Sequence, residues 1–171
     1  MLGSLKLYKS PLEFIELAQK LPQFTFELVV NDTQENINGF MKEHKINICK
    51  NLTIYPQQND VVPFYNQASL VLNLSDKKQV VETFGLTALE AMSAGLPVIV
   101  PTEGGIAEMV VDGENGYKID VQNLNQIAEC IKTILSDETL YMKLAQNALA
   151  YSKRFSEAKM VNCIEMILNR K

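Results

Sequence analysis

The sequence is poor in the residues that form disulfides and metal sites. Its 171 residues include one histidine, His44, and three cysteines, Cys49, Cys130 and Cys163. The cysteines are far apart and form no C-x-x-C pair, which excludes a disulfide scaffold and a zinc site. Each cysteine lies among apolar residues, so we expect three small buried side chains. His44 lies between two charged residues near a polar helix end, where we expect it at the solvated surface.

The sequence also lacks long apolar runs and an excess of positive charge. No stretch of about 18 apolar residues predicts a transmembrane helix, and residues 1–4 have neither the basic nor the apolar part of a signal peptide. Together with three unpaired thiols, this favours the cytoplasm. Sixteen basic and twenty acidic residues give a net charge of −4, which excludes sequence-independent nucleic-acid binding through a basic surface. A local phosphate site fits this charge, because it needs only backbone amides and one or two cations.

The composition is that of one ordinary globular domain. Hydrophobic residues make up 47% of the chain and charged residues 21%, and the mean hydropathy is −0.02. These values exclude a disordered, collagen-like or coiled-coil chain. The length allows a full hydrophobic core, and the sequence shows neither an internal repeat nor a low-complexity linker. We therefore expect residues 1–171 to form a single domain.

Strand and helix patterns alternate over about the first 120 residues. Ser10-Pro11-Leu12-Glu13 is typical of a capping box with proline at the first helical position, and Pro22 should end that helix. The pattern predicts strands at 1–3, 24–30, 52–55, 69–74, 97–100 and 117–119, and helices at 12–21, 33–44, 60–67, 84–94, 105–110 and from 123 almost to the end.

This alternation predicts an α/β fold of the Rossmann-like type. We expect a doubly wound parallel sheet with helices on both faces, and a helical C-terminal tail that packs back on the sheet. Residues 98–100 and 71–72 are apolar without alternation, as in strands that are buried on both faces. Ligands of such sheets bind at the carboxyl ends of the strands, against helix N-termini.

One predicted helix start lies at such a place. Phe84, Gly85 and Leu86 open the helix at 84–94, so their N–H groups have no intrahelical partners. These amides and the helix dipole favour an anion such as a diphosphate. The absence of a side chain at Gly85 would let a ligand approach the backbone closely.

Three further polar residues accompany this helix. Glu82 precedes it, Thr87 adds a hydroxyl in its first turn, and Glu90 follows Thr87 by three positions and so faces the same side. The Glu90 carboxylate could accept hydrogen bonds from both hydroxyls of a sugar diol. Two glutamates at this spacing are by themselves more often solvated acids, so the surrounding sequence must decide between the two interpretations.

The stretch from Glu82 to Gly116 resembles the donor-binding, C-terminal half of GT-B-fold retaining glycosyltransferases of family 4. Their pattern is E-x-F-G-(apolar)-x-x-L-E-A-M-(small)-(small)-G-x-P-V, followed by a G-G-x-x-E turn and a D-G-x-N-G turn. The matching residues are Glu82, Phe84, Gly85, Leu86, Leu89, Glu90, Ala91, Met92, Ala94, Gly95, Pro97, Val98, Gly104, Gly105, Glu108, Asp112, Gly113, Asn115 and Gly116. Lys9, in G-S-L-x-x-x-K, and Arg154-Phe155-Ser156 also match the family, more weakly.

The resemblance implies a nucleotide-sugar-binding domain, the second half of a two-domain hexosyltransferase that makes a polysaccharide or glycoconjugate. The first half, a Rossmann-like domain with the acceptor site, is absent from this sequence, so we expect the chain to be inactive alone. The resemblance implies no metal and no cofactor besides the donor, such as a UDP-sugar. It is also compatible with peripheral association of the full enzyme with the inner face of the membrane.

The resemblance also implies a role for each site residue. Glu82 is the candidate catalytic residue, near the anomeric carbon and the sugar hydroxyls. The donor would further be bound by Lys9 and Thr87 at the diphosphate, by the amides of Phe84, Gly85 and Leu86 at phosphate and sugar oxygens, by Glu90 at the ribose and by Gln58 at the base.

The sequence departs from the family pattern at three places. Ser4 replaces the usual arginine, which removes one diphosphate cation unless Lys6 substitutes for it. Ser10 replaces the glycine after the lysine, and Asn31-Asp32 replace a G-x-G turn. The departures leave the identity of the donor open.

Two alternative interpretations remain. The first is a stand-alone flavodoxin-like or receiver-like module, although the chain lacks the acidic cluster or phosphate loop that these need after the first strand. The second is an interaction domain that keeps the fold without catalysis, which Ser4 favours. The loop with Lys77-Lys78 is expected to be solvated, within reach of an anionic ligand.

Overall fold

Two parallel three-stranded sheets form the centre of the molecule. The computed structural model describes residues 1–155 and 157–168. The sheets have the orders β1-β2-β3 and β4-β5-β6. Their strands are β1 (Leu2–Gly3), β2 (Phe26–Val30), β3 (Leu52–Tyr55), β4 (Val71–Leu72), β5 (Val98–Val100) and β6 (Gly116–Lys118).

The two sheets share one apolar core. Leu28 and Val30 of β2 belong to the same buried cluster as Leu72 of β4 and Ile99 of β5. Leu2 of β1 packs in turn against the cluster of the second sheet. The predicted Rossmann-like α/β fold is therefore confirmed, although the expected single sheet is divided into two halves. In each sheet one edge strand has only two residues: β1 in the first sheet and β4 in the second.

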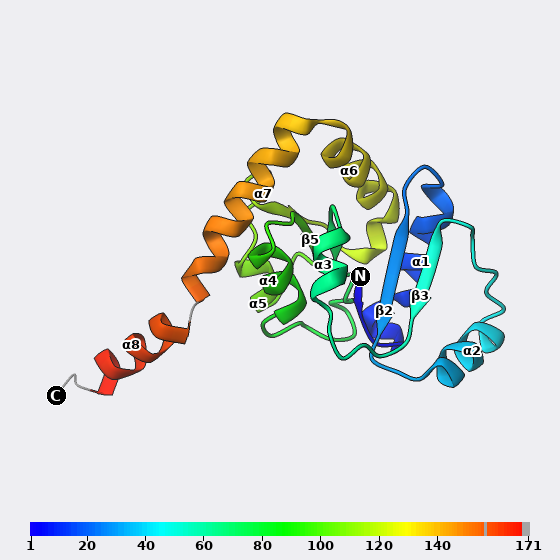
Figure 1. The fold of residues 1–171 in the computed structure, drawn as a ribbon, viewed down its shortest axis with the longest axis horizontal. Coiled ribbons are helices and arrows are strands. Elements are labelled where there is room, and N and C mark those ends of the chain that lie inside the picture. The colour runs from blue at the N-terminus through cyan, green and yellow to red at the C-terminus, as the bar shows by residue number, and fades with distance from the viewer. Residues whose placement is uncertain (156, 169–171) are drawn as a thin grey trace.

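Helices cover both sheets (Figure 1). The longer ones are α1 (Pro11–Lys20), α2 (Gln34–Glu43), α3 (Val62–Gln67), α4 (Leu86–Ser93), α6 (Leu124–Ser136), α7 (Glu138–Ser152) and α8 (Glu157–Leu168). The shorter ones are α5 (Gly105–Glu108) and the 3-10 turns η1 (Leu7–Lys9), η2 (Val121–Asn123) and η3 (Lys153–Phe155). Helix α1 packs against α6, and α4 packs against α7. None of the helices in the described part of the chain is long and apolar enough to span a membrane.

The start of α1 differs from the prediction. Ser10 has a left-handed backbone (φ 55°, ψ 49°), and its side chain makes no capping hydrogen bond. The reason is the 3-10 turn η1 directly before it, because the Ser10 amide donates to the Leu7 carbonyl (2.8 Å) and closes that turn. The predicted capping box is therefore wrong. Glycine adopts this conformation without a Cβ penalty, which gives a physical reason for the family's glycine at this position.

The C-terminal tail packs back on the sheets only in part. Ile127, Ile131 and Leu144 of α6 and α7 are buried in the main core, as expected. Figure 1 shows α8 beyond the end of α7, away from both sheets. The described apolar side chains near its end, Met166 and Ile167, are exposed. The expectation of a tail packed along its whole length is wrong for α8, which extends past the sheets (Figure 1).

Candidate functional site

Lys9 and Glu82 meet at the carboxyl end of β4. They are 73 residues apart in sequence, and the Lys9 ammonium forms an ion pair with Glu82 Oε2. Ser75, three residues after β4, joins them: its hydroxyl donates to Glu82 Oε2 (2.9 Å) and accepts from Lys9 Nζ (3.3 Å). The sequence predicted Lys9 and Glu82 but missed Ser75. The available signal was a polar residue directly after a buried strand, the place where ligands of this fold class bind.

The pair is partly withdrawn from solvent. The side chains of Lys9 and Glu82 are 24% and 20% exposed. Burial acts to raise the pKa of Glu82, but the hydrogen bonds from Lys9 and Ser75 outweigh it and hold this pKa below its ordinary value. Glu82 is therefore an anion at neutral pH, and an anionic ligand that binds Lys9 must compete with it.

Helix α4 begins two residues later than predicted, at Leu86. The backbone amides without intrahelical partners are therefore also found later in the sequence. Gly85 is the N-cap with a left-handed backbone (φ 80°), and Leu86 is the first helical residue. The Ala88 amide already donates to the Gly85 carbonyl (3.0 Å), so the amides of Leu86 and Thr87 lie before the first bond of the helix. The free amides were predicted at Phe84, Gly85 and Leu86. In the structure they lie one residue later, so that the Thr87 amide is included.

The reason for Gly85 also differs from the prediction. A Cβ atom at this position would lie 2.5 Å from the Ile106 side chain. The α-carbon therefore faces α5 rather than an open ligand site. Glycine is needed here for the positive φ and for packing on Ile106, so the predicted close approach of a ligand to Gly85 is not its structural reason.

Gly104 and Gly105 support the loop that carries Glu82. A Cβ atom at Gly104 would lie 2.3 Å from the carbonyl oxygen of Glu82, and one at Gly105 would lie 1.9 Å from that of Thr83. The start of α5 therefore packs closely against the backbone of residues 82–83. The double glycine therefore allows this close packing beside Glu82, a role that spacing alone does not reveal.

Glu90 is bonded to a buried tyrosine. Tyr65 of α3 donates from Oη to Glu90 Oε2 (2.7 Å). The Tyr65 Oη atom also lies 3.4 Å from the Thr87 carbonyl oxygen. Burial first, and then the bond to Glu90, raise the pKa of Tyr65. Tyr65 was not among the predicted site residues. Tyr65 and Glu90 are 25 residues apart in sequence, so no local sequence pattern predicts their contact.

Gln58 does not reach the other predicted residues in this structure. It lies on the loop between β3 and α3, and its side-chain nitrogen donates to the nearby Pro56 carbonyl (2.9 Å). Its contact with a base therefore stays a prediction.

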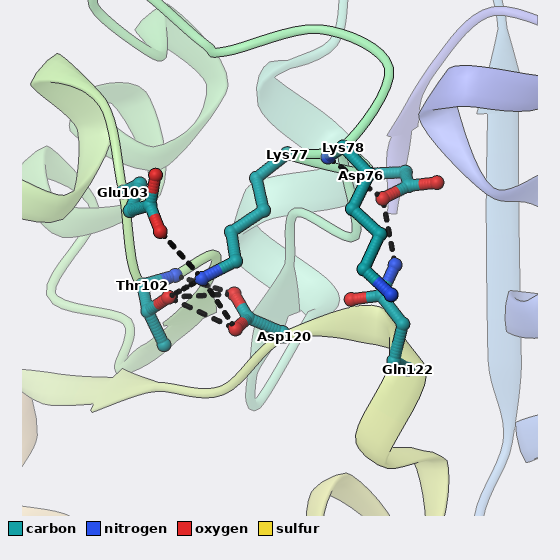
Figure 2. Close-up of polar contacts among 7 residues, drawn as sticks. All are labelled: Asp76, Lys77, Lys78, Thr102, Glu103, Asp120 and Gln122. Carbon is teal, nitrogen blue, oxygen red and sulfur yellow. Dashed lines mark hydrogen bonds and ion pairs between the residues drawn. The ribbon is translucent and has the colours of Figure 1, made fainter.

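The loop after β4 is anchored rather than freely solvated (Figure 2). Lys77 forms ion pairs with Glu103 (2.7 Å) and Asp120 (2.9 Å) and donates to the Thr102 hydroxyl (2.7 Å). Lys77 is thereby held at the ends of β5 and β6, so the expectation of a solvated side chain is wrong for Lys77, whereas Lys78 is exposed as expected.

Asp76 anchors the same loop a second time. Its Oδ1 accepts from Gln122 Nε2 (2.6 Å) and from the Lys78 amide (3.0 Å). The Asp76 amide donates to the Tyr8 carbonyl (2.8 Å), which ties the loop to the segment that carries Lys9. The network therefore fixes Lys9 and Ser75 relative to each other.

Comparison with known proteins identifies the family. Residues 1–151 match the family described as "Glycosyl transferases group 1". The chain belongs to this family. It is 30% identical to the N-acetyl-alpha-D-glucosaminyl L-malate synthase of Bacillus anthracis, over 82% of this chain and 36% of that protein.

Solved structures agree with this assignment. Anabaena HepE in complex with UDP and glucose superposes with a TM-score of 0.83 at 26% identity, over 99% of this chain and 48% of that one. The C-terminal domain of LpcC, a group 1 glycosyl transferase from Francisella tularensis, superposes with a TM-score of 0.74 at 29% identity, over 90% of this chain and 82% of that domain. The fold is thus that of GT-B glycosyltransferases. The chain spans about a third of the Bacillus anthracis protein and about half of HepE.

The departures from the family pattern have local explanations. Lys6 and Lys9 both lie over the Tyr8 ring, with Nζ atoms 5.8 Å and 5.7 Å from its centroid. Compensation for Ser4 by Lys6 stays a prediction. Thr33 caps α2, because its hydroxyl accepts from the Asn36 amide (3.2 Å). Asp32 supports this cap with its carboxylate, which accepts from the Thr33 amide (2.8 Å).

The remaining candidate residues lie outside the site. His44 packs against the Phe40 ring (4.4 Å between centroids) and is half-buried. Cys49 and Cys130 are half-buried rather than fully buried, and burial raises the pKa of Cys130 to about 12. The Cys163 side chain and Ser156, part of the late family motif, lie outside the described residues. Within the described part of the chain, no three His, Cys, Asp or Glu side chains are grouped as a metal site.

Proposed function

We propose that the chain is the C-terminal, donor-binding half of a two-domain retaining glycosyltransferase of family 4 type, and that it binds a nucleotide-diphosphate sugar. The observation that carries this proposal is the ion pair of Lys9 and Glu82. It puts a cation and an acid together at the carboxyl end of a strand. Binding of UDP and glucose by HepE supports the proposal, as does the likeness to the C-terminal domain of LpcC.

In this proposal the donor lies between Lys9 and helix α4. Lys9 pairs with the diphosphate, while the amides of Leu86 and Thr87 and the Thr87 hydroxyl contact its oxygens. Amides at Phe84 and Gly85 complete the contacts to phosphate and sugar oxygens. Glu90 accepts from the ribose hydroxyls.

Transfer would rest on electrostatic stabilisation. Cleavage of the donor leaves negative charge on the diphosphate, which Lys9 and the helix amides neutralise. Positive charge develops at the anomeric carbon, and the Glu82 carboxylate can stabilise it because its low pKa keeps it ionised. Glu82 is therefore assigned as a charge-stabilising group and sugar ligand rather than as a proton donor. The proposal includes no metal ion.

The acceptor site is assigned to an N-terminal Rossmann-like domain outside this sequence. The isolated chain should therefore bind the donor but transfer no hexose to a polysaccharide or glycoconjugate acceptor. Transfer at the rate of a complete enzyme by residues 1–171 alone would contradict this part of the proposal. A cytoplasmic location, with peripheral association with the inner face of the membrane, belongs to the same proposal.

Calorimetric titration with UDP, GDP and their sugars tests the assigned pocket. Lys9→Ala and Glu90→Ala should each weaken binding about tenfold or more, because a hydrogen bond to a charged group contributes about 1.5 kcal/mol or more. Lys42→Ala is the matched control, since Lys42 is an exposed lysine of α2. Unchanged affinity in both site variants would contradict the pocket. Absence of binding in the unaltered chain would favour a non-catalytic interaction domain.

A further inference from the structure

We infer that Tyr65 is a positioning residue that holds the Glu90 carboxylate for the ribose hydroxyls of the donor and so enables the protein to distinguish ribose from 2′-deoxyribose. The inference rests on the proposed function, in which Glu90 is the ribose ligand.

The geometry gives Glu90 one fixed anchor. Glu90 is an exposed residue on α4, and within the described part of the chain Tyr65 is its one polar side-chain partner. A glutamate without such a partner samples many rotamers, and binding must then order it. The short bond from Tyr65 Oη to Oε2 (2.7 Å) orders the carboxylate before the ligand arrives.

Tyr65 itself is rigidly held. Its side chain is 5% exposed and belongs to the apolar cluster that includes Val71, Ala88 and Met92. The same hydroxyl lies 3.4 Å from the Thr87 carbonyl, within the turn that leads to Glu90. Tyr65 thus contacts both ends of the first turn of α4 from the neighbouring helix.

The hydrogen-bond chemistry leaves room for a diol. A carboxylate has about four acceptor positions, and the Tyr65 hydroxyl occupies one of them on Oε2. Oε1 and the second position of Oε2 remain for two neighbouring ribose hydroxyls. The Tyr65 hydroxyl keeps its proton because its pKa is raised, so it remains a donor to one position of Oε2 and leaves the other positions to the ligand hydroxyls.

The test compares ribose and 2′-deoxyribose nucleotides. Dissociation constants are measured for UDP and GDP, each with its 2′-deoxy analogue, on the unaltered chain and on Tyr65→Phe. For the base that binds, the unaltered chain should prefer the ribonucleotide about tenfold, the scale of one hydrogen bond to a charged group. Tyr65→Phe should reduce this preference to about threefold or less, with a smaller loss of affinity for the deoxy analogue, which keeps only its 3′-hydroxyl for Glu90.

Tyr55→Phe is the matched control. Tyr55 also donates from its hydroxyl to a carboxylate, Glu27 (3.2 Å), but not to a residue of the proposed pocket. This variant should keep the full preference. A general loss of packing in Tyr65→Phe would instead weaken both nucleotides equally and would overturn the inference.

A double-mutant cycle separates a positioning role from a structural one. If Tyr65 acts through Glu90, then Tyr65→Phe combined with Glu90→Ala should show the same preference as Glu90→Ala alone. An additive effect would overturn the inference while the proposed function stands. Failure of the unaltered chain to bind any of the four nucleotides would overturn the proposed function and the inference with it.

Discussion

At the scale of single residues, the charge state of Glu82 determines how the Lys9–Glu82 pair responds to acid. Its pKa is depressed in the folded chain, so the unfolded state binds its proton at a higher pH than the folded state does. The ion pair with Lys9 therefore stabilises the fold above the ordinary pKa of 4.5, and this contribution is lost as the pH falls through the folded value.

Glu82→Gln should remove this acid dependence. Between about pH 5 and 3 the free energy of unfolding should fall more steeply for the unaltered chain than for Glu82→Gln, by no more than about 1 kcal/mol, because the pair is partly exposed and screened. Urea unfolding over a pH series measures the difference. Parallel pH profiles for the two proteins would show that the Lys9–Glu82 pair does not stabilise the folded chain.

Individual residues also show where sequence reasoning reaches its limit. Lys9 and Glu82 could be predicted because the family pattern marks both, and the structure brings them together. Ser75 and Tyr65 are not part of the family pattern. Their importance arises from contacts that close only when distant segments fold onto each other, at separations of 66 and 25 residues.

At the scale of elements, local pattern predicted which segments are helices and strands better than where they end. The strand expected at 69–74 is reduced to β4, residues 71–72, and shortly after its end the Ser75 amide donates to the Asn73 side chain (3.1 Å) instead of to a strand. The helix expected at 84–94 starts at Leu86 because Gly85 has a positive φ. Both changes occur at the site, where side-chain bonds and backbone strain override propensity.

The contact between α5 and the loop that carries Glu82 can be tested by adding one methyl group at Gly105. Gly105→Ala would place a Cβ atom 1.9 Å from the Thr83 carbonyl oxygen, so the loop must move. We expect a loss of about 1–3 kcal/mol in stability, the usual cost of overpacking, and weaker nucleotide binding because Glu82 is displaced.

Gly39→Ala provides the control for that substitution. Gly39 lies in α2, and nothing lies within 4 Å of a Cβ atom there. Alanine should stabilise this exposed helix by up to about 1 kcal/mol and leave nucleotide binding unchanged. Thermal unfolding and calorimetry measure both effects, and equal behaviour of the two variants would contradict the assigned contact.

At the scale of the whole molecule, the two half-sheets share one core, and the matched part covers about a third to a half of longer relatives. The family match excludes the flavodoxin-like and receiver-like interpretations. The alternation of strand and helix patterns could predict the fold class but not this relation, because it carries no information about a partner domain. The net charge of −4 is compatible with the proposed diphosphate site, which relies on Lys9 and the α4 amides rather than on a basic surface.

The central claim, that a nucleotide diphosphate binds between Lys9 and the start of α4 without a metal, is tested most directly by amide NMR shifts on titration with UDP and GDP in EDTA. The amides of Leu86 and Thr87 should show the largest shifts with the nucleotide that binds, and Lys9→Ala should greatly reduce them. Shifts centred elsewhere on the molecule, or shifts that appear only after a divalent metal is added, would contradict the account.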